Sequence, residues 1–177
     1  MTAKNKLEPQ FAAIVAGQHN NPFALLGPHT ANGGRVVRTL QPDAKRVTLV
    51  DGNGDTLAEM DKVHEGGLFE GQLPPRKRRY AFRIDWRSGE TSVEEDPYRF
   101  PSTLGEMDLY LLGEGSDLYI YRKLGSHIRE VQGVLGTRFA VWAPNASRVS
   151  LVGDFNSWDG RRHVMRLHPG NGIWEIF

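Results

Sequence analysis

Alternating apolar and polar positions run through most of this chain, and residues 137–159 show the pattern most clearly. Phe139 and Val141 fall on one side of an extended segment, a turn containing Pro144 follows, and Val149 and Leu151 resume the alternation. Alternation with a period of two is the signature of a half-buried β-strand, so this stretch predicts two short strands joined by a turn. Such a hairpin needs a second sheet over its apolar face, which predicts a β-sandwich.

The same pattern occurs a second time, nearer the N-terminus. Residues 42–50 (Pro-Asp-Ala-Lys-Arg-Val-Thr-Leu-Val) align with residues 144–152 (Pro-Asn-Ala-Ser-Arg-Val-Ser-Leu-Val), and six of these nine positions are identical. Residues 67–70 (Gly-Leu-Phe-Glu) align in the same way with residues 172–175 (Gly-Ile-Trp-Glu). A repeat of this length is too long for a solenoid, whose units span roughly 20 to 50 residues, and it indicates two copies of one domain.

We therefore predict an all-β fold with two related β-sandwiches in tandem, joined by short helices. The expected divisions are an N-terminal helix with a plug loop in residues 1–34, the first sandwich in 35–100, a helical hinge or linker in 101–133 and the second sandwich in 134–177. The first copy contains an alternating segment at residues 80–86 whose counterpart would lie after Phe177. The second sandwich is therefore expected to be truncated, and the chain to be a fragment of a longer protein.

Local signals place the individual elements. One helix is expected over about residues 8–16, ending at Gly17, and a second is expected from a capping box of Thr103 and Glu106 to a stop at Gly113. Residues 117–133 show no pattern that favours either a helix or a strand. The strands expected in the first copy are residues 36–40, 46–50, 57–60, 68–73 and 80–86.

The composition excludes several classes of function. The net charge is +1, with 22 basic and 21 acidic residues, so the chain lacks the basic surface that dominates nucleic-acid binding. The one basic cluster, residues 76–79, is interpreted as a solvated hairpin loop. There is no cysteine, which suits a reducing compartment, and the apolar segment 11–16 is too short to span a bilayer. We expect a cytoplasmic protein with neither nucleic acid nor a membrane as a partner.

The sequence contains no constellation that supports catalysis. The acidic residues 94–96 fall in a polar segment expected to be a solvated linker, and His163 is expected on a surface turn. The six histidines lack metal-site spacing, and there is no phosphate-binding glycine motif or nucleophile elbow. We therefore expect no catalytic residue, no metal site and no cofactor in this chain.

The candidate ligand contacts are Phe155, Asn156, Trp158 and Asp159, which lie within five residues of one another. Sugar rings present apolar faces to aromatic planes and hydroxyl groups to short polar side chains, and these four residues supply both kinds of partner. Two interpretations remain open for Trp158. It is either a platform for a sugar or a residue that packs in the core or between domains.

Several motifs resemble a known family. Residues 137–159 look like carbohydrate-binding module family 48, a sandwich of the immunoglobulin type that precedes the catalytic barrel in glycogen and starch enzymes of glycoside hydrolase family 13. The segment 136–146 (Gly-Thr-Arg-Phe-Ala-Val-Trp-Ala-Pro-Asn-Ala) is shared by branching enzymes, debranching enzymes and trehalose-forming hydrolases. Four further segments are similar to bacterial 1,4-α-glucan branching enzymes with an additional N-terminal sandwich, namely residues 21–29, 95–100, 121–127 and 155–163.

The resemblance, which covers residues 10–177, implies two immunoglobulin-like sandwiches and a role in glycogen biosynthesis. The whole protein would cut α-1,4 glucan chains and rejoin them through α-1,6 bonds, using two carboxylates on a (β/α)₈ barrel. These residues do not include that barrel, so the chain is expected to be inactive alone and to have the barrel as its partner. Asn21 departs from the aspartate usual in the family.

The resemblance also implies a ligand. Trp158 matches an aromatic residue that binds glucan in some members of the module family, which makes glycogen or a maltooligosaccharide the implied partner. In branching enzymes the module could instead brace the barrel. Two other functions remain open: a stand-alone α-glucan-binding or scaffolding module, and the same region of a debranching hydrolase.

Overall fold

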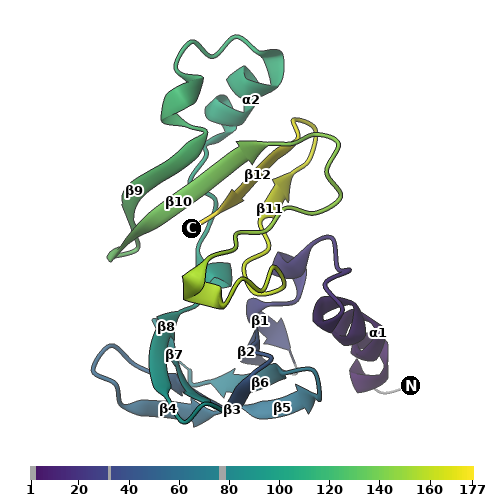
Figure 1. Cartoon of the computed structure of the whole chain (residues 1–177), viewed down its shortest axis with the longest axis vertical. Helices are drawn as coiled ribbons and strands as arrows, with labels where there is room; N and C mark the ends of the chain where they lie inside the picture. The colour runs from purple at the N-terminus through teal and green to yellow at the C-terminus, as the bar shows by residue number, and fades with distance from the viewer. Residues whose placement is uncertain (1–2, 32, 76–78) are drawn as a thin grey trace. The chain divides into compact units, whose positions relative to one another are not determined.

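The computed structural model describes residues 3–31, 33–75 and 79–177, and its strands form three antiparallel sheets of four strands within those residues (Figure 1). The strand orders are β1-β2-β6-β5, β4-β3-β7-β8 and β11-β12-β10-β9. The chain divides into two compact units, one running to His19 and continuing over Phe23–Arg99, the other holding Asn20–Pro22 and Phe100–Phe177. The predicted all-β class is confirmed. No helix in the described ranges is long and apolar enough to cross a membrane.

The element bounds place all five strands predicted for the first unit within two residues of their predicted positions, and they add strands that were not predicted. The first unit contains α1 (Ala3–Val15), all of η1 (Pro22–Ala24) except Pro22, β1 (Gly27–Ala31), β2 (Gly34–Leu40), β3 (Ala44–Val50), β4 (Thr56–Glu59), β5 (Asp61–His64), β6 (Leu68–Leu73), β7 (Ala81–Trp86), β8 (Thr91–Glu95) and η2 (Pro97–Arg99). The second contains α2 (Glu106–Glu114), η3 (Ile120–Arg122), β9 (Gly125–Val131), β10 (Val134–Trp142), η4 (Asp154–Asn156), β11 (Arg166–His168) and β12 (Ile173–Ile176).

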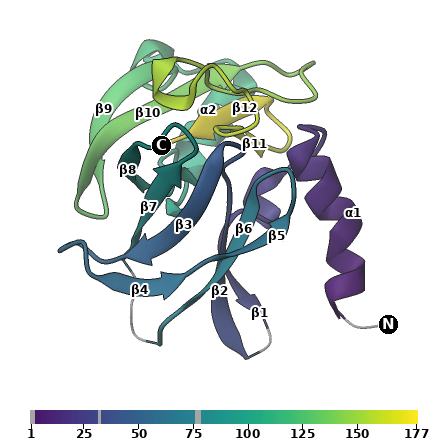
Figure 2. The ribbon, with the colours of Figure 1, turned by 60° about the horizontal axis from the view of Figure 1, so that its bottom comes forward.

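The first unit is a sandwich whose two sheets enclose a common apolar core. Val37 on β2 points into this core, opposite Phe82 on β7. On the other face of β2, Leu40 packs with Phe11 and Ile14 of α1, which lies against the β1-β2-β6-β5 sheet (Figure 2). Strand β2 is therefore buried on both faces over residues 36–40, and this includes the polar residues Arg38 and Thr39.

Helix α1 ends where the sequence predicts. Gly17 has φ +67°, its N–H donates to the carbonyl of Ile14 at 3.0 Å, and the N–H of Gln18 donates to that of Ala13 at 2.8 Å. These two bonds form a Schellman motif, which needs a left-handed residue at this position and therefore favours glycine.

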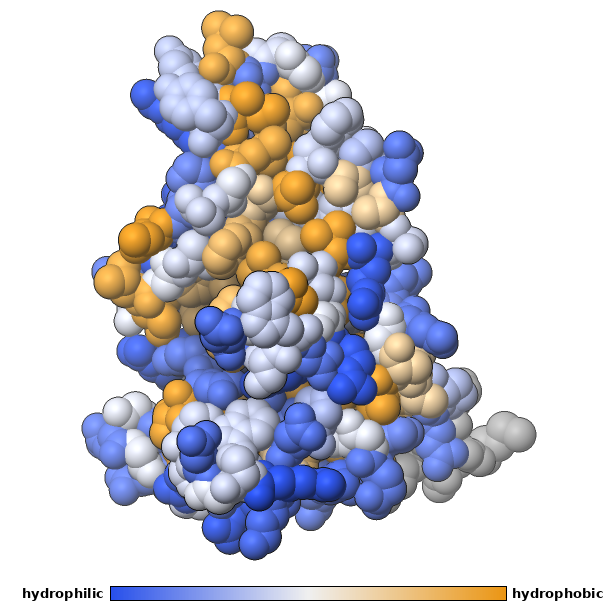
Figure 3. Space-filling model, in the orientation of Figure 1, coloured by the Kyte–Doolittle hydropathy of each residue, from blue (hydrophilic) through white to orange (hydrophobic). Residues whose placement is uncertain are grey.

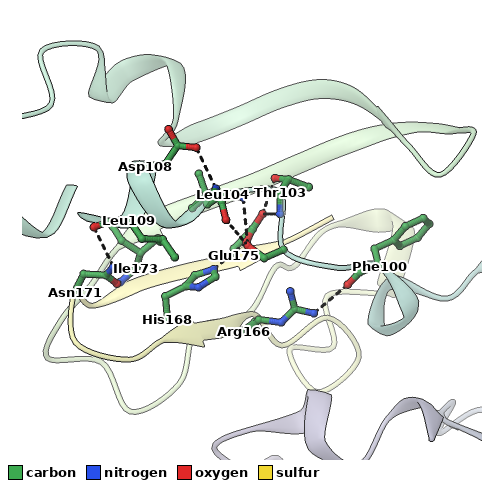
Figure 4. Close-up of polar contacts among 12 residues, drawn as sticks. Phe100, Thr103, Leu104, Asp108, Leu109, Arg166, His168, Asn171, Ile173 and Glu175 are labelled. Carbon is green, nitrogen blue, oxygen red and sulfur yellow. Dashed lines mark hydrogen bonds and ion pairs between the residues drawn. The ribbon is translucent and has the colours of Figure 1, made fainter. Parts of the chain in front are cut away.

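The second unit is built on one sheet, and the segment before it is fixed to that sheet (Figure 4). Leu104 and Leu112 pack against Ala140 of β10 and Ile173 of β12. The carboxylate of Glu175 on β12 accepts hydrogen bonds from Ser102 and Thr103 of the same segment. The predicted hinge over residues 101–133 is therefore wrong in its second half, because residues 125–131 form β9 and pair with β10.

The segment predicted as a hinge is a second copy of the N-terminal segment. Each copy runs as α-helix, 3-10 helix and two paired strands. Gly115 closes α2 with φ +70° and a Schellman motif, as Gly17 closes α1. His29 and His127 occupy the same place, and the Nε2 atom of each lies 2.9 Å from the carbonyl oxygen three residues earlier. The predicted plug loop is likewise partly a strand, β1, paired with β2.

The pairing register confirms the duplication. Thr39 pairs with Phe69 in the first unit and Val141 with Trp174 in the second, which reproduces the offsets seen in the sequence alignment. A glycine stands at the same point of both copies for a steric reason. A Cβ on Gly67 would lie 2.4 Å from the Cα of Pro42, and a Cβ on Gly172 would lie 2.6 Å from the Cα of Pro144.

The two copies differ at the predicted strand 149–151. In the first copy the equivalent residues belong to β3, which pairs with both β4 and β7. In the second copy no described residue stands at the position of β7, and only an isolated bridge joins Ser150 to Val164. Phe139 and Val141 do not form the predicted hairpin with this segment, because β10 pairs with β9 and β12, as β2 of the first copy pairs with β1 and β6. A strand needs a hydrogen-bonded neighbour, which local alternation does not provide.

The acidic segment 94–96 is not a solvated linker. Residues 91–95 form β8, and the Asp96 side chain is fully buried. Its Oδ2 accepts a hydrogen bond from the Tyr80 hydroxyl at 2.5 Å, and its Oδ1 accepts one from the Tyr98 N–H at 2.9 Å. Of the basic cluster predicted to be a solvated loop, residues 76–78 lie outside the described residues.

The predicted capping box at the start of α2 is also wrong. Helix α2 begins at Glu106, and the N–H of Gly105 donates to Oδ2 of Asp108 at 3.1 Å. Thr103 lies outside the helix, and its hydroxyl donates to Glu175 at 2.6 Å. A buried carboxylate accepts a stronger hydrogen bond than a helix terminus offers, which explains the different partner.

Candidate carbohydrate-binding site

The predicted ligand contacts lie in one turn of the second unit, residues 153–163, which we call the aromatic turn. Phe155 belongs to the short helix η4 and Trp158 follows it, and their side chains are 57% and 67% exposed. The indole N–H of Trp158 donates to Oδ1 of Asp154 at 3.0 Å. This bond anchors the edge of the indole while the ring stays largely accessible to solvent.

The backbone beneath the indole is strained. Ser157 and Trp158 have φ +54° and +59°, in the left-handed region that side chains other than glycine rarely adopt. The N–H of Asp159 donates to the carbonyl of Asn156 at 3.0 Å, which closes a turn with both central residues at positive φ. Each such residue costs about 1–2 kcal/mol. Strain of this kind concentrates at functional sites, where the surrounding structure maintains it.

Asn156 maintains the turn from inside. Its side chain is fully buried, its Oδ1 accepts a hydrogen bond from Gly153 N–H at 3.0 Å and its Nδ2 donates to the Leu151 carbonyl at 2.9 Å. Nδ2 also lies 3.1 Å from Nδ1 of His163. Asn156 therefore shapes the aromatic turn, and its buried amide does not reach the surface where a ligand would lie.

His163 is a packed residue of the aromatic turn, which corrects the predicted surface position. Its ring meets that of Phe155 edge to face, with centroids 5.2 Å apart. Burial, helped by the nearby charge of Arg162, lowers the pKa of His163 to about 4. The imidazole is therefore neutral at neutral pH, so its Nδ1 can accept the hydrogen bond from Asn156.

Asp159 is held by an ion pair within the turn. Its Oδ2 lies 2.6 Å from Nη2 of Arg161, and its Oδ1 accepts from Nε of the same residue at 2.9 Å. The hydrogen bonds from Arg161 hold the pKa of Asp159 below its usual value, although partial burial opposes them. A forked pair of this kind fixes the positions of both side chains.

The structure thus separates the four predicted contacts into three kinds. Phe155 and Trp158 are exposed, the carboxylate of Asp159 is paired with the guanidinium of Arg161, and Asn156 is buried. Sequence reasoning missed the supporting roles of Asp154, Arg161 and His163. Nothing in the local pattern indicated them, because their partners are set by the left-handed turn.

The strain in the aromatic turn can be tested at Ser157. Ser157→Gly is expected to be neutral or to stabilise the second unit by about 0.5 kcal/mol, because glycine adopts positive φ without a steric penalty. Ser157→Val is expected to destabilise it by about 2 kcal/mol, because a β-branched side chain is least compatible with this conformation. Thermal denaturation of the two variants measures the difference, and equal melting temperatures would contradict the assigned backbone.

A large apolar cavity lies elsewhere on the second unit. It has a volume of about 620 Å³ and is lined by Phe139, Val149, Leu151 and Met165, among others. The residues that align with these four in the first unit, Val37, Val47, Leu49 and Met60, all belong to the core between its two sheets. In Figure 3, apolar side chains gather on the surface of the second unit, over β9 and β10. This cavity is therefore an uncovered core face, with few groups that could bind sugar hydroxyls.

Among the described residues there is no group of three or more histidine, aspartate or glutamate side chains arranged to hold a metal ion.

Comparison with known proteins identifies two domain families in the chain. The family described as alpha-1,4-glucan branching enzyme GlgB, N-terminal domain, matches residues 8–98, and carbohydrate-binding module 48 (isoamylase N-terminal domain) matches residues 123–177. The chain is 54% identical over 170 residues to 1,4-alpha-glucan branching enzyme GlgB of Rubrobacter xylanophilus, which covers 96% of this chain and 23% of that protein. It is 53% identical over 167 residues to the enzyme of the same name from Paramagnetospirillum magneticum, which covers 93% and 22%.

The chain thus spans about a quarter of the length of these curated relatives. Among solved structures, the catalytic module of the multi-modular glycogen-degrading pneumococcal virulence factor SpuA matches 41% of this chain and 12% of its own. The sequence identity is 21% and the TM-score 0.30, a likeness too distant to bear on fold or function.

Proposed function

Since the chain belongs to the family of N-terminal domains of alpha-1,4-glucan branching enzyme GlgB, we propose that it positions α-glucan chains for a branching enzyme in glycogen biosynthesis. The aromatic turn is the proposed contact. Relatives of this chain are named 1,4-alpha-glucan branching enzymes, and the second unit of the chain matches carbohydrate-binding module 48.

The exposed indole of Trp158 carries this proposal. Glucose rings in an α-glucan offer apolar faces that stack on aromatic rings, and Trp158 presents such a ring, fixed by its bond to Asp154. Phe155 adds a second exposed ring, and the pair of Asp159 and Arg161 supplies charged groups for sugar hydroxyls. Because the turn is held before the ligand arrives, little ordering entropy is lost on binding.

The proposal gives this chain a binding role and leaves the branching reaction to other residues. Cleavage and transfer with retention need two carboxylates about 5 Å apart. The acidic side chains of the aromatic turn are engaged in its own hydrogen bonds: Asp154 accepts from Trp158, and Asp159 accepts from Arg161. We therefore propose that the reaction takes place on a barrel in the remaining length of a GlgB protein. A cytoplasmic location fits this function, and a cysteine-free sequence suits a reducing compartment.

Affinity electrophoresis in gels containing glycogen tests the contact. Trp158→Ala is expected to weaken retardation of the chain roughly five- to thirtyfold, the effect of losing about 1–2 kcal/mol at a well-placed aromatic contact. Trp142→Ala is a matched control, because Trp142 is 61% exposed on β10 and lies outside the aromatic turn. The control should leave retardation unchanged.

The same gels distinguish binding from bracing. If the aromatic turn only supports a neighbouring domain, wild type and both variants migrate alike in gels with and without glycogen. That result would remove the proposed contact.

A further inference from the structure

The uncovered core face of the second unit continues to the edge of its sheet. The cavity of about 620 Å³ is lined not only by core-facing residues such as Phe139 and Leu151 but also by Gly125, the first residue of β9. We call this whole surface the open core face. Its counterpart in the first unit is covered by β7, whose Phe82 and Ile84 belong to the core there. The first unit therefore shows what such a face accepts.

One side of the segment 149–151 is bonded in the same way as β3 in the first copy. The N–H of Met165 donates to the carbonyl of Val149 at 2.8 Å, and the N–H of Met60 donates to that of Val47 at 3.1 Å. The segment thus already lies along the line that a strand of this sheet would follow.

The other side of the segment has no neighbour in the described residues. In the first copy, Thr48 pairs on that side with Arg83 of β7. Its counterpart Ser150 is joined only to Val164, on the opposite side, and its N–H and carbonyl have no hydrogen-bond partner among the residues that the structure describes. An unpaired main-chain edge of this kind accepts an added β-strand.

Gly125 indicates a second point of contact at the end of this face. Gly27 and Gly125 begin β1 and β9 with φ +85° and +91°. A Cβ on Gly27 would lie 2.8 Å from the carbonyl oxygen of Tyr98, whereas a Cβ on Gly125 would meet no described atom within 4 Å. The position that the turn after β8 occupies in the first unit is therefore open beside Gly125.

An aromatic ring next to Gly125 also differs in burial from its counterpart. In the first unit, Phe23 of η1 meets the ring of Tyr98 edge to face, with centroids 4.9 Å apart. The equivalent residue of η3 is Tyr121, which is 63% exposed. Tyr98 itself belongs to an Asp-Pro-Tyr turn, in which the carboxylate of Asp96 accepts from the Tyr98 N–H at 2.9 Å.

We propose that the open core face is a docking surface for a polypeptide segment with the chemistry of residues 80–99, an extended strand with alternating apolar side chains that ends in an Asp-Pro-aromatic turn. The strand pairs with the edge at Ser150 and fills the cavity with its apolar side chains. The aromatic ring of the turn lies on Gly125 beside Tyr121. The chain spans about a quarter of its curated relatives, so proteins of this family have the length to supply such a segment within one polypeptide.

A synthetic peptide of residues 80–100 is a suitable probe, because residues 47–50 and 149–152 are nearly identical and should accept the same partner. Fluorescence anisotropy of the labelled peptide gives its dissociation constant for the full chain. Hydrogen exchange of the Ser150 amide, followed by NMR, locates the contact. At a peptide concentration ten times the dissociation constant, this exchange should slow about elevenfold.

A matched pair of glycine substitutions tests the position of the turn. Gly125→Asn places a side chain where the turn would lie, and we expect it to weaken peptide binding about tenfold or more. Gly170→Asn is the control, because Gly170 has φ +95°, no described atom within 4 Å of its Cβ position and no place in the cavity lining. It should impose similar backbone strain and leave binding unchanged, since asparagine tolerates positive φ better than most residues.

Tyr121→Ala keeps the test valid if Gly125→Asn does not fold, as thermal denaturation would show. It should weaken binding about fivefold through loss of the ring contact. Tyr110→Ala, which changes a ring of similar exposure on α2 outside the cavity lining, should have no effect. With a peptide that carries Tyr98→Ala, Tyr121→Ala should make no further difference, because the two rings form one contact.

The outcomes decide between occupants. Unchanged Ser150 exchange at peptide concentrations up to about 1 mM overturns the proposal, and so does binding that is equally strong in Gly125→Asn, Tyr121→Ala and their controls. Slower Ser150 exchange that grows with the concentration of the chain alone assigns the face to a second copy and overturns the proposed occupant. Slower exchange produced by a maltooligosaccharide in place of the peptide assigns the face to glucan and overturns it as well.

Discussion

Glu175→Ala is expected to lower the free energy of unfolding of the second unit by about 3–5 kcal/mol, the cost of breaking a buried charged network. The side chain of Glu175 is 2% exposed, and its carboxylate accepts hydrogen bonds from the Ser102 hydroxyl at 2.7 Å and from the N–H and hydroxyl of Thr103 at 2.7 and 2.6 Å. Nε2 of His168 lies 2.9 Å away (Figure 4). Removing the carboxylate leaves all of these groups without their buried acceptor.

Hydrogen exchange of the β12 amides, followed by mass spectrometry, measures this loss directly. Glu114→Ala serves as the control, because Glu114 is exposed at the end of α2 and accepts only a surface bond from Tyr110. It should change stability by less than about 0.5 kcal/mol. Equal exchange rates for the two variants would show that Glu175 does not hold the segment before α2 against the sheet.

Glu175 also predicts how the second unit responds to acid. Burial alone would raise the pKa of Glu175, but the hydrogen bonds from His168, Thr103 and Ser102 outweigh it and hold the pKa at about 2. The folded-state pKa lies below the ordinary value of 4.5, so the stabilisation is complete above pH 4.5 and is lost as the pH falls toward 2. Protection of the β12 amides should decrease over that window in the wild type and much less in Glu175→Gln.

Asp96→Ala is expected to destabilise the first unit by about 3 kcal/mol. The substitution leaves the Tyr80 hydroxyl and the Tyr98 N–H, which both donate to Asp96, buried without an acceptor. Each unsatisfied buried group costs about 1–3 kcal/mol. Chemical denaturation monitored by the fluorescence of Trp86, which lies in this unit, measures the change. A loss below about 1 kcal/mol would mean that water replaces the carboxylate.

The stabilisation that Asp96 gives to the first unit depends on pH with a sign opposite to that of Glu175 in the second unit. Burial raises the pKa of Asp96 to about 6, although Tyr80 and Tyr98 act against it. A raised folded-state pKa gives a stabilisation that is complete below pH 3.8 and is lost as the pH rises toward 6. The first unit of the wild type should therefore lose about 1 kcal/mol between pH 5 and pH 7 relative to Asp96→Asn, which does not titrate.

The duplication was the part of the fold most accessible from the sequence. Gly67 lies against the backbone of Pro42, and Gly172 lies against that of Pro144. Because neither position has room for a side chain, a glycine is required at both, and the two glycines therefore align in the sequence. The prediction of a strand at residues 149–151 is wrong because strand formation depends on more than the local sequence. Its sequence nearly repeats that of β3, but β-structure depends on a neighbouring strand, and here only the Ser150–Val164 bridge forms.

The candidate site was predictable in its exposed residues and not in its supports. Trp158 and Phe155 stood out because large aromatic side chains in a polar turn are unusual. Asn156 looked like another ligand contact because a buried turn amide and an exposed one have the same local sequence. Only the left-handed backbone at Ser157 and Trp158 turns Asn156 inward and brings His163 beneath Phe155.

Because β2–β6 and β10–β12 share the same register, the two copies are equivalent scaffolds that carry different loops. Residues 47–50 and 149–152 hold nearly the same side chains at the base of two different connections, a short glycine-rich hairpin in one copy and an aromatic turn in the other. Protein engineers can therefore graft either connection onto its sister copy at matched stem positions, and so vary the number of exposed aromatic rings without redesigning a hydrophobic interior.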